Sequence, residues 1–294
     1  MYKVGIDLGG TKIEGIVLDD KNNEIIRKRV PTEQEQGYDH ILRNIKQLQI
    51  DLTGSLDDNY TFGVGTPGAI SRKTQLMKNS NTTCLNGRPI QQDLEALLKR
   101  NIAIENDANC FAMAEAMLGA GKGYKSVFGV IMGTGCGGGI VYDGEVIKGN
   151  QSIAGEWGHM TIDPKNGPPC YCGKKGCVER YISGGGLESL YESTFGEKKK
   201  LSNIMLDFRK GEARDYDFVQ NFMERFGVAL SNVLTILDPD IVVLGGGVSN
   251  IEELYTLGIE QVRRYIFNDA LETQIVKNKC GDSAGVLGAA FIGI

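Results

Sequence analysis

The feature that most constrains the fold is a strand–turn–strand unit that occurs twice. In the first copy the turn is Gly9-Gly10-Thr11-Lys12, and in the second it is Gly133-Thr134-Gly135. The flanking apolar strands are predicted at 4–8 and 13–18 in the first copy and at 127–132 and 139–142 in the second. The two Gly-Thr pairs lie 123 residues apart, which is far longer than the period of a solenoid repeat. The chain is therefore predicted to consist of two related α/β halves.

The rest of the chain alternates helical and strand patterns. Ile41, Ile45, Leu48 and Leu52 share one face of a helix predicted over 38–53. The same kind of pattern predicts further strands at 62–65, 102–104 and 241–244, and helices around 94–98, at 108–118, from 218 to 237 and at 284–291. We predict a small α/β domain over 1–108, completed by the C-terminal helix within 284–294. A large α/β domain is predicted over 109–283.

Composition excludes several classes of protein. With 41% hydrophobic and 23% charged residues among 294, the chain resembles an ordinary globular protein. A net charge of −5 argues against a strongly basic nucleic-acid binder. The longest uncharged run, 126–142, contains six glycines and is not a membrane span. Because Asp7 interrupts any apolar signal region, we expect a cytoplasmic protein.

Three glycine turns each follow an apolar strand and are predicted to bind phosphates. Backbone N–H groups in such turns form an anion-binding concavity that no Cβ obstructs. A single turn of this kind would be an ordinary hairpin, but three support one another. None has a Walker sequence or the dinucleotide-binding fingerprint. The candidate residues are Gly9, Gly10, Thr11, Lys12, Gly133, Thr134, Gly135, Gly245, Gly246 and Gly247.

Asp7 lies inside the first apolar strand, where an unpaired carboxylate would be costly. It could simply make backbone hydrogen bonds at the end of the strand. The glycine turn two residues later favours a second interpretation, in which Asp7 associates with magnesium. Mg²⁺ is usually held by one or two carboxylates together with substrate phosphates.

Asp107 follows a predicted strand and opens a helix in the segment Asn106-Asp107-Ala108-Asn109. Considered alone, this position is typical of a helix N-cap. In a phosphate-binding protein it also suits a general base that accepts a hydroxyl proton during phosphoryl transfer. We expect its side chain to project from the strand end into a cleft between the two domains.

A zinc site is predicted from one histidine and three of the seven cysteines. His159 is followed by Cys170, Cys172 and Cys177. A Cys₃His set fits a closed tetrahedral structural zinc site. The alternative is an incidental cluster of cysteines in a loop. The odd number of cysteines argues against a disulfide framework.

Together these motifs resemble those of the ROK sugar kinases, a family of repressors, open reading frames and kinases. The matching segments are 7–12, 106–109, 156–159 and 170–179, and the resemblance extends from Val4 to Gly288. It implies a two-domain actin-like (ribonuclease-H-like) ATPase fold with an interdomain cleft. It also implies ATP with Mg²⁺, one structural zinc ion and a homodimer.

The resemblance further implies roles for individual residues. Asp107 would deprotonate a sugar hydroxyl, normally that on C6. The turns at 9–12 and 133–135 would face phosphates, and 245–247 would face the adenosine. The residues expected to hold sugar hydroxyls are Gly68, Asn81, Asn106, Asp107, Glu156, His159 and Glu179.

The hexose is predicted from three segments, 78–87, 154–159 and 169–174, which look most like those of bacterial fructokinases, also called manno(fructo)kinases. We therefore expect phosphorylation of D-fructose to fructose 6-phosphate. The loop at 160–169 is shorter than in that branch and looks more like the loop of ROK glucokinases. N-acetylglucosamine kinases share most of the motifs, so glucokinase and N-acetylglucosamine kinase are the alternatives.

An alternative of a different class is a sugar-sensing transcriptional regulator. Such regulators carry a helix-turn-helix before the first strand, whereas here that strand is predicted by residue 4. A pure sensor would also not need Asp107. The sequence therefore favours the kinase.

Overall fold

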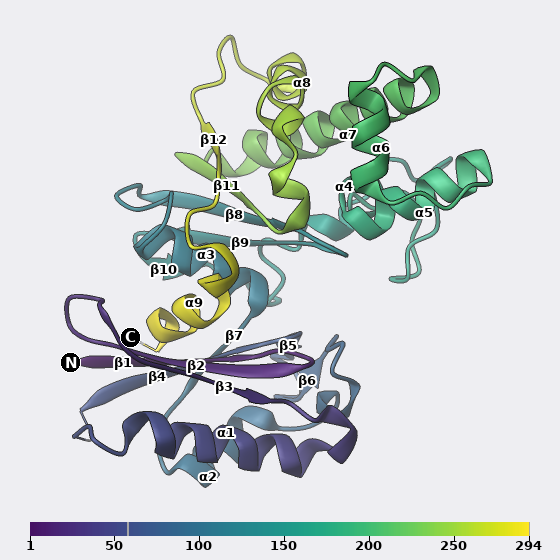
Figure 1. Cartoon of the computed structure of the whole chain (residues 1–294). Coiled ribbons are helices and arrows are strands. Elements are labelled where there is room, and N and C mark those ends of the chain that lie inside the picture. Colours follow the sequence, from purple (N-terminus) through teal and green to yellow (C-terminus); the bar gives the residue numbers. More distant parts are fainter. Residues whose placement is uncertain (58, 294) are drawn as a thin grey trace. The chain divides into compact units, whose positions relative to one another are not determined.

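The computed structural model describes residues 1–57 and 59–293 (Figure 1). The chain divides into two compact units. The first comprises Met1–Lys125, Gly139–Ala154 and the chain from Lys279 onward, and the second comprises Ser126–Gly138 and Gly155–Asn278. These limits differ from the domain boundary expected near residue 108, which remains a prediction.

The first unit is built on a five-stranded mixed sheet in the order β3-β2-β1-β4-β7. Its strands are β1 (Tyr2–Leu8), β2 (Lys12–Leu18), β3 (Glu24–Pro31), β4 (Tyr60–Thr66) and β7 (Ala103–Asn106). Strands β1, β2 and β3 form an antiparallel meander, while β4 and β7 run parallel to β1. A two-stranded ribbon of β5 (Ala69–Ile70) and β6 (Met77–Lys78) follows β4.

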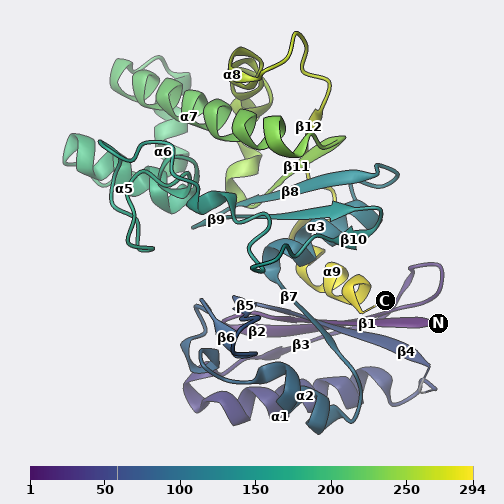
Figure 2. The same cartoon turned by 180° about the vertical axis from the view of Figure 1, so that it is seen from behind.

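Helices cover both faces of this sheet, as Figures 1 and 2 show. On one face lie α1 (Tyr38–Thr53) and α2 (Ile90–Leu98), whose apolar residues join those of the strands in one core. On the other face, α9 (Ala284–Ile292) packs against β1 and β4, and α3 (Asp107–Met117) packs against α9. The last helix of the chain therefore completes the N-terminal sheet.

Two glycines let α9 approach the sheet closely. A Cβ on Gly5 in β1 or on Gly63 in β4 would overlap the backbone of Ala289 and Ala290. Because no larger side chain fits here, these glycines are required by helix–sheet packing. Some of the chain's glycines are therefore explained by packing and not by ligand binding.

The second sheet has the order β10-β9-β8-β11-β12 and repeats the first. It contains β8 (Ser126–Met132), β9 (Cys136–Tyr142), β10 (Glu145–Val146), β11 (Ile241–Gly245) and β12 (Gln274–Lys277). Strands β11 and β12 run parallel to β8, as β4 and β7 do to β1. The predicted duplication of an α/β unit is confirmed by this common strand order.

Five helices belong to the described part of the second unit, and α7 is the longest of them. They are α4 (Glu179–Ile182), α5 (Gly184–Phe195), α6 (Leu201–Arg209), α7 (Ala213–Leu237) and α8 (Leu257–Tyr265). The 3₁₀ turns of the chain are at Gln34–Gln36, Thr83–Leu85, Trp157–His159, Gly247–Asn250, Glu252–Tyr255 and Gly281–Ser283. No helix within 1–57 or 59–293 is long and apolar enough to cross a membrane.

Elements with clear periodicity were predictable, and the others were not. The helix predicted over 38–53 has the bounds of α1, because one continuous apolar face is buried there. Strand β3 was not predicted, since it is an edge strand with little buried surface. Helices α5, α6 and α8 and strand β12 were also missed.

Candidate functional site

The first glycine turn is a hairpin turn between β1 and β2, as predicted. The Gly9 N–H donates to the Lys12 carbonyl at 2.9 Å. From beyond β3, the Thr32 hydroxyl donates to the Gly9 carbonyl at 2.7 Å and the Thr32 N–H donates to the Thr11 carbonyl at 3.0 Å. These two hydrogen bonds fix the conformation of the turn. The sequence did not predict this role for Thr32. Thr11 and Lys12 are exposed.

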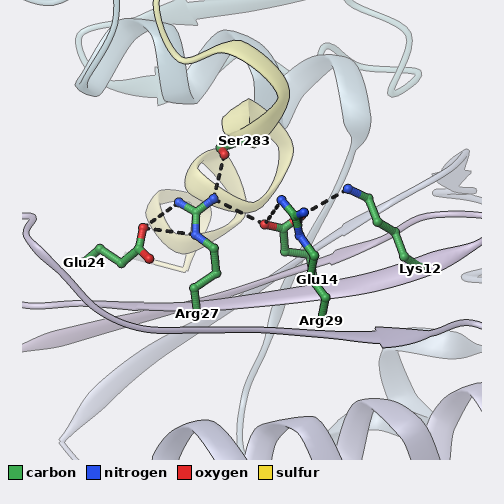
Figure 3. Close-up of polar contacts among 6 residues, drawn as sticks. All are labelled: Lys12, Glu14, Glu24, Arg27, Arg29 and Ser283. Carbon is green, nitrogen blue, oxygen red and sulfur yellow. Dashed lines mark hydrogen bonds and ion pairs between the residues drawn. The ribbon is translucent and has the colours of Figure 1, made fainter.

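A row of charged side chains crosses the sheet beside this turn. Asp7 in β1, Glu14 in β2 and Arg29 in β3 are directly opposite one another, so they share one face of the sheet. Glu14 is only 2% exposed and accepts from Arg29 at 2.9 Å. Arg27 lies 3.3 Å and Lys12 3.5 Å from the same carboxylate (Figure 3).

Three cations surround Glu14 near the glycine turn. Arg27 also pairs with Glu24 and donates to the Ser283 hydroxyl at 2.6 Å, which ties β3 to the start of α9 (Figure 3). Lys12 and Arg29 remain about half exposed. Both are therefore available to a phosphate bound at the turn, where opposite charge strengthens hydrogen bonds.

Asp107 lies close enough to Asp7 to raise the pKa of the Asp7 carboxyl. Burial, followed by repulsion from Asp107 and Glu14, raises the pKa of the Asp7 carboxyl from 3.8 to about 6. The pKa of the Asp107 carboxyl is also raised, because the neighbouring protein replaces part of its hydration, although the residue is exposed. A divalent cation between such carboxylates would relieve their repulsion. The carboxylate chemistry fits the magnesium expected with ATP.

Replacing Asp7 by Asn is expected to stabilise the nucleotide-free protein at neutral pH. The raised pKa means that folding favours the protonated carboxyl, so stability is fully present below pH 3.8 and is lost as the pH rises to about 6. A shift of this size corresponds to about 3 kcal/mol above that range. Thermal melts in buffer without nucleotide, magnesium or chelator should show a higher Tm for Asp7→Asn at pH 7.5 and a smaller difference at pH 5. An equal difference at both pH values would contradict this cause.

Asp107 is the first residue of α3, directly after β7 ends at Asn106. The N-cap considered for Asp107 is in fact Asn106, whose Oδ1 accepts from the Asn109 N–H at 2.8 Å. The Asp107 carboxylate accepts from the N–H of its neighbour Ala108 at 2.9 Å. The helix therefore does not depend on Asp107 for its cap. Because Asn106 Oδ1 is engaged, Nδ2 is the atom it would offer to a sugar.

The other two candidate sugar residues of the first unit, Gly68 and Asn81, lie in neighbouring segments. Gly68 has a φ of +97°, and a Cβ there would lie 2.6 Å from the Lys78 carbonyl oxygen and 2.8 Å from the Ser80 nitrogen. Only glycine fits this close approach of two loops. The exposed Asn81 follows Ser80, whose N–H and carbonyl are both bonded by the Asn86 side chain. Gly68, Asn81, Asn106 and Asp107 thus belong to one unit.

The second unit contains the remaining candidates, Glu156, His159 and Glu179. Buried Glu179 begins α4, and its Oε2 accepts from the Cys136 N–H at 2.9 Å. A Cβ on Gly135 would lie 2.8 Å from the same oxygen. Glu179, predicted to bind sugar, therefore lies directly beneath the second glycine turn. Glu156 immediately precedes the short turn Trp157–His159.

The predicted zinc ligands are gathered in the second unit. The ligand atoms of His159, Cys170, Cys172 and Cys177 all lie within 4.8 Å of one another. Cys172 and Cys177 have their sulfurs 3.5 Å apart, and His159 Nδ1 lies 3.7 Å from the Cys170 sulfur. Tetrahedral zinc places its ligands about 3.5 Å apart, so this donor set fits the ion.

The loop that carries these ligands is closed by its own backbone. The Cys170 N–H donates to the Lys174 carbonyl at 2.8 Å, and the Val178 N–H donates to the Met160 carbonyl at 2.9 Å. His159 Nε2 lies 2.9 Å from the hydroxyl of Tyr171, whose side chain is 82% exposed. The ring nitrogen that would face a sugar thus has an exposed hydroxyl as its partner.

A cavity of about 780 Å³ brings two of the three glycine turns together in the second unit. Its walls include Gly133 and Thr134 from one turn and Gly247 from the other. Gly245 is buried in β11, and Gly246 packs against the backbone of Met132, so neither lines the cavity. This volume lies within the usual range for small-molecule sites.

The start of α5 also borders this cavity, which the sequence did not indicate. The N–H groups of Gly184 and Gly185 donate to the carbonyls of Gly133 and Thr134, at 2.7 and 3.2 Å. The Gly186 N–H donates to the Ser183 hydroxyl. The N–H groups of Gly184 and Gly185 therefore fix the second glycine turn, and none of the three is left free for a ligand. The run Ser183-Gly-Gly-Gly was the available signal in the sequence.

Comparison with known proteins decides the family. A profile described as ROK family matches residues 3–293. The chain belongs to the ROK family. A relative from Vibrio atlanticus, named N-acetyl-D-glucosamine kinase, is 41% identical over 299 residues, covering 99% of each sequence.

Two solved ROK structures resemble the chain over its whole length. The ROK hexokinase from Thermus thermophilus is 32% identical with a TM-score of 0.88, covering 100% of this chain and 98% of that one. A ROK family glucokinase from Streptomyces griseus, in complex with glucose and AMPPNP, is 26% identical with a TM-score of 0.75, covering 100% and 99%. The expected actin-like ATPase fold is thereby confirmed, while its cleft stays a prediction. The Vibrio atlanticus relative carries the name of an alternative, N-acetylglucosamine kinase, and not that of fructokinase.

Proposed function

We propose that the chain is an ATP-dependent sugar kinase that phosphorylates N-acetyl-D-glucosamine at its C6 hydroxyl. The observation that carries this proposal is the 41% identity, over 99% of both sequences, to a protein named N-acetyl-D-glucosamine kinase. N-acetylglucosamine replaces fructose as the proposed substrate. Fructose was expected from three short segments, and these are weaker evidence than sequence identity along the entire chain.

In this proposal Asp107 is the general base. A carboxylate whose pKa is raised by desolvation is a better proton acceptor than an ordinary aspartate. Asn106, held as the cap of the same helix, would orient the sugar next to it through Nδ2. Asp107 would accept the proton of the hydroxyl as its oxygen attacks the terminal phosphorus of ATP.

The phosphates would be bound by the glycine turns and by the cations around Glu14. Lys12 and Arg29 supply positive charge beside the turn at 9–12, and Glu14 limits how far their side chains move. Magnesium, when bound with ATP, neutralises charge on the phosphates. Asp7 is the carboxylate that would face it. The cavity at Gly133, Thr134 and Gly247 would take the nucleotide.

The zinc ligands would act on the sugar indirectly. With all four residues as ligands a zinc ion would have no open position, so its role would be structural and not catalytic. Binding at His159 Nδ1 would fix the ring and aim Nε2 at a sugar hydroxyl in place of the Tyr171 hydroxyl. Glu179 lies two residues after Cys177 and would be positioned by the same loop.

The substrate is tested with a coupled assay for ADP release. We expect kcat/KM for N-acetylglucosamine to exceed that for fructose, glucose, mannose and N-acetylmannosamine by at least about tenfold, equivalent to ~1.4 kcal/mol in the transition state. Fructose winning by the same margin would restore the first expectation. Failure to phosphorylate any of the five sugars would favour the sugar-sensing regulator. The homodimer and the cytoplasmic location remain proposals, the first testable by light scattering.

A further inference from the structure

The first turn of α9 lies directly against the carboxylate of Asp7, and both belong to the first unit. A Cβ on Gly285, the second residue of α9, would lie 2.5 Å from Asp7 Oδ2 and 2.9 Å from its Cγ. The first distance is about 0.9 Å less than the 3.4 Å at which ordinary van der Waals contact begins. The space that a side chain on Gly285 would need is therefore taken by the Asp7 carboxylate.

The neighbouring strands leave this carboxylate little room to move away. Gly65 in β4 is directly opposite Asp7, and a Cβ there would lie 3.6 Å from Asp7 Oδ1 and 3.0 Å from the sulfur of buried Cys110. Glu14 in β2 is opposite Asp7 on the other side. Like charges that are directly opposite in a sheet repel each other. The carboxylate is thus bordered by two glycines and by a second carboxylate.

The beginning of α9 is anchored and cannot easily yield instead. Just before the helix, fully buried Glu115 accepts from the N–H of Lys279 at 3.0 Å and from that of Cys280 at 2.7 Å. Arg27 donates to the Ser283 hydroxyl at 2.6 Å (Figure 3). Because these bonds hold the helix start, a methyl group on the second residue of α9 would displace the carboxylate and not the helix.

We propose that Gly285 is a positioning residue, which keeps the Asp7 carboxylate where it can face the magnesium bound with ATP. The proposal rests on the proposed function and adds a residue from the other end of the chain to the nucleotide site. Mg²⁺ demands near-ideal octahedral geometry, so it tolerates little displacement of a carboxylate. A misplacement of about 1 Å can lower the rate of a reaction by about 100-fold. Glycine at this position therefore serves the geometry of the site as well as the packing of α9.

The first test is a double-mutant cycle followed by Tm, without nucleotide or magnesium. Gly285 has helical backbone, so alanine fits there and by itself favours the helix. Gly285→Ala should lower the Tm of the parent by at least about 2 °C, because the Cβ strikes the carboxylate. In an Asp7→Ala background the same change should leave the Tm unchanged or raise it. Equal losses in both backgrounds would show that the Cβ strikes another group, and the proposal would be wrong.

The second test measures the magnesium dependence of nucleotide binding by calorimetry with AMPPNP. In Gly285→Ala the half-saturating magnesium concentration should rise about 10–100-fold, the usual result of removing support from a metal ligand. The affinity for AMPPNP without magnesium should change much less. The matched control is Phe291→Leu, which removes buried surface near the other end of α9. It should lower the Tm but leave the magnesium dependence as in the parent.

The outcomes separate this proposal from the function on which it rests. If the parent needs magnesium and Gly285→Ala needs no more of it, the positioning role is wrong and the kinase proposal stands. If Phe291→Leu shifts the magnesium dependence as much as Gly285→Ala, loosening of α9 is the cause and the positioning role is again wrong. A parent that binds AMPPNP equally well with and without magnesium would refute both the positioning role and the magnesium site proposed at Asp7.

Discussion

Replacing Asp107 by Asn is expected to lower kcat by about 10²–10⁴-fold, the usual contribution of a general base. The substitution keeps the size of the side chain but removes its ability to accept a proton. Folding should be unaffected, because the cap of α3 is Asn106 and not Asp107. Sugar affinity should remain within a few-fold of the parent. Steady-state kinetics, together with the fluorescence of the single tryptophan, Trp157, next to Glu156, would measure both quantities.

The matched control is Asp39→Asn. Asp39 also lies in the first turn of a helix in the same unit, α1, and is exposed. It should retain full turnover. If Asp107→Asn folds normally and turns over at nearly the parental rate, Asp107 is not the base.

Loss of the zinc site is expected to have the second largest effect. Cys172→Ser should lower the zinc content from about one ion per chain, lower the Tm, and raise the sugar KM by about 10–100-fold, the usual result of loosening residues that orient a site. The ATP KM should change less, because the loop carries His159 and lies next to Glu179 but does not line the 780 Å³ cavity. Elemental analysis and kinetics of protein purified without chelator would test this.

Cys84→Ser serves as the control, since Cys84 lies outside the cluster. It should keep both the metal and the sugar KM. Fully active parent protein with less than about 0.2 zinc per chain would show that the cysteines have another role. If the variant loses zinc and stability but keeps its sugar KM, the zinc site is purely structural. The proposal that zinc orients His159 toward the sugar would then be wrong.

The glycines illustrate what local sequence indicates and what it leaves open. Gly9-Gly10 and Gly133 follow strands and precede return strands, so their turns were recognisable from neighbouring residues alone. Gly5 and Gly63 cannot be distinguished from the turn glycines by their neighbours in the sequence. They are required because α9, more than 200 residues later in the chain, packs directly on them. Gly246 faces the Met132 backbone and not the cavity. Which glycine faces a ligand depends on contacts between distant segments.

The sequence by itself determined the α/β class, the duplication and the cluster of one histidine and three cysteines. Each of these features is predicted by short-range periodicity or by the spacing of a few chemically distinctive side chains. Only the tertiary structure decided that Asn106 caps α3 and that Arg27 and Arg29 surround Glu14. These facts depend on which strands pair and which loops meet. Burial and hydrogen-bond partners are set by that long-range packing, and no local pattern encodes it.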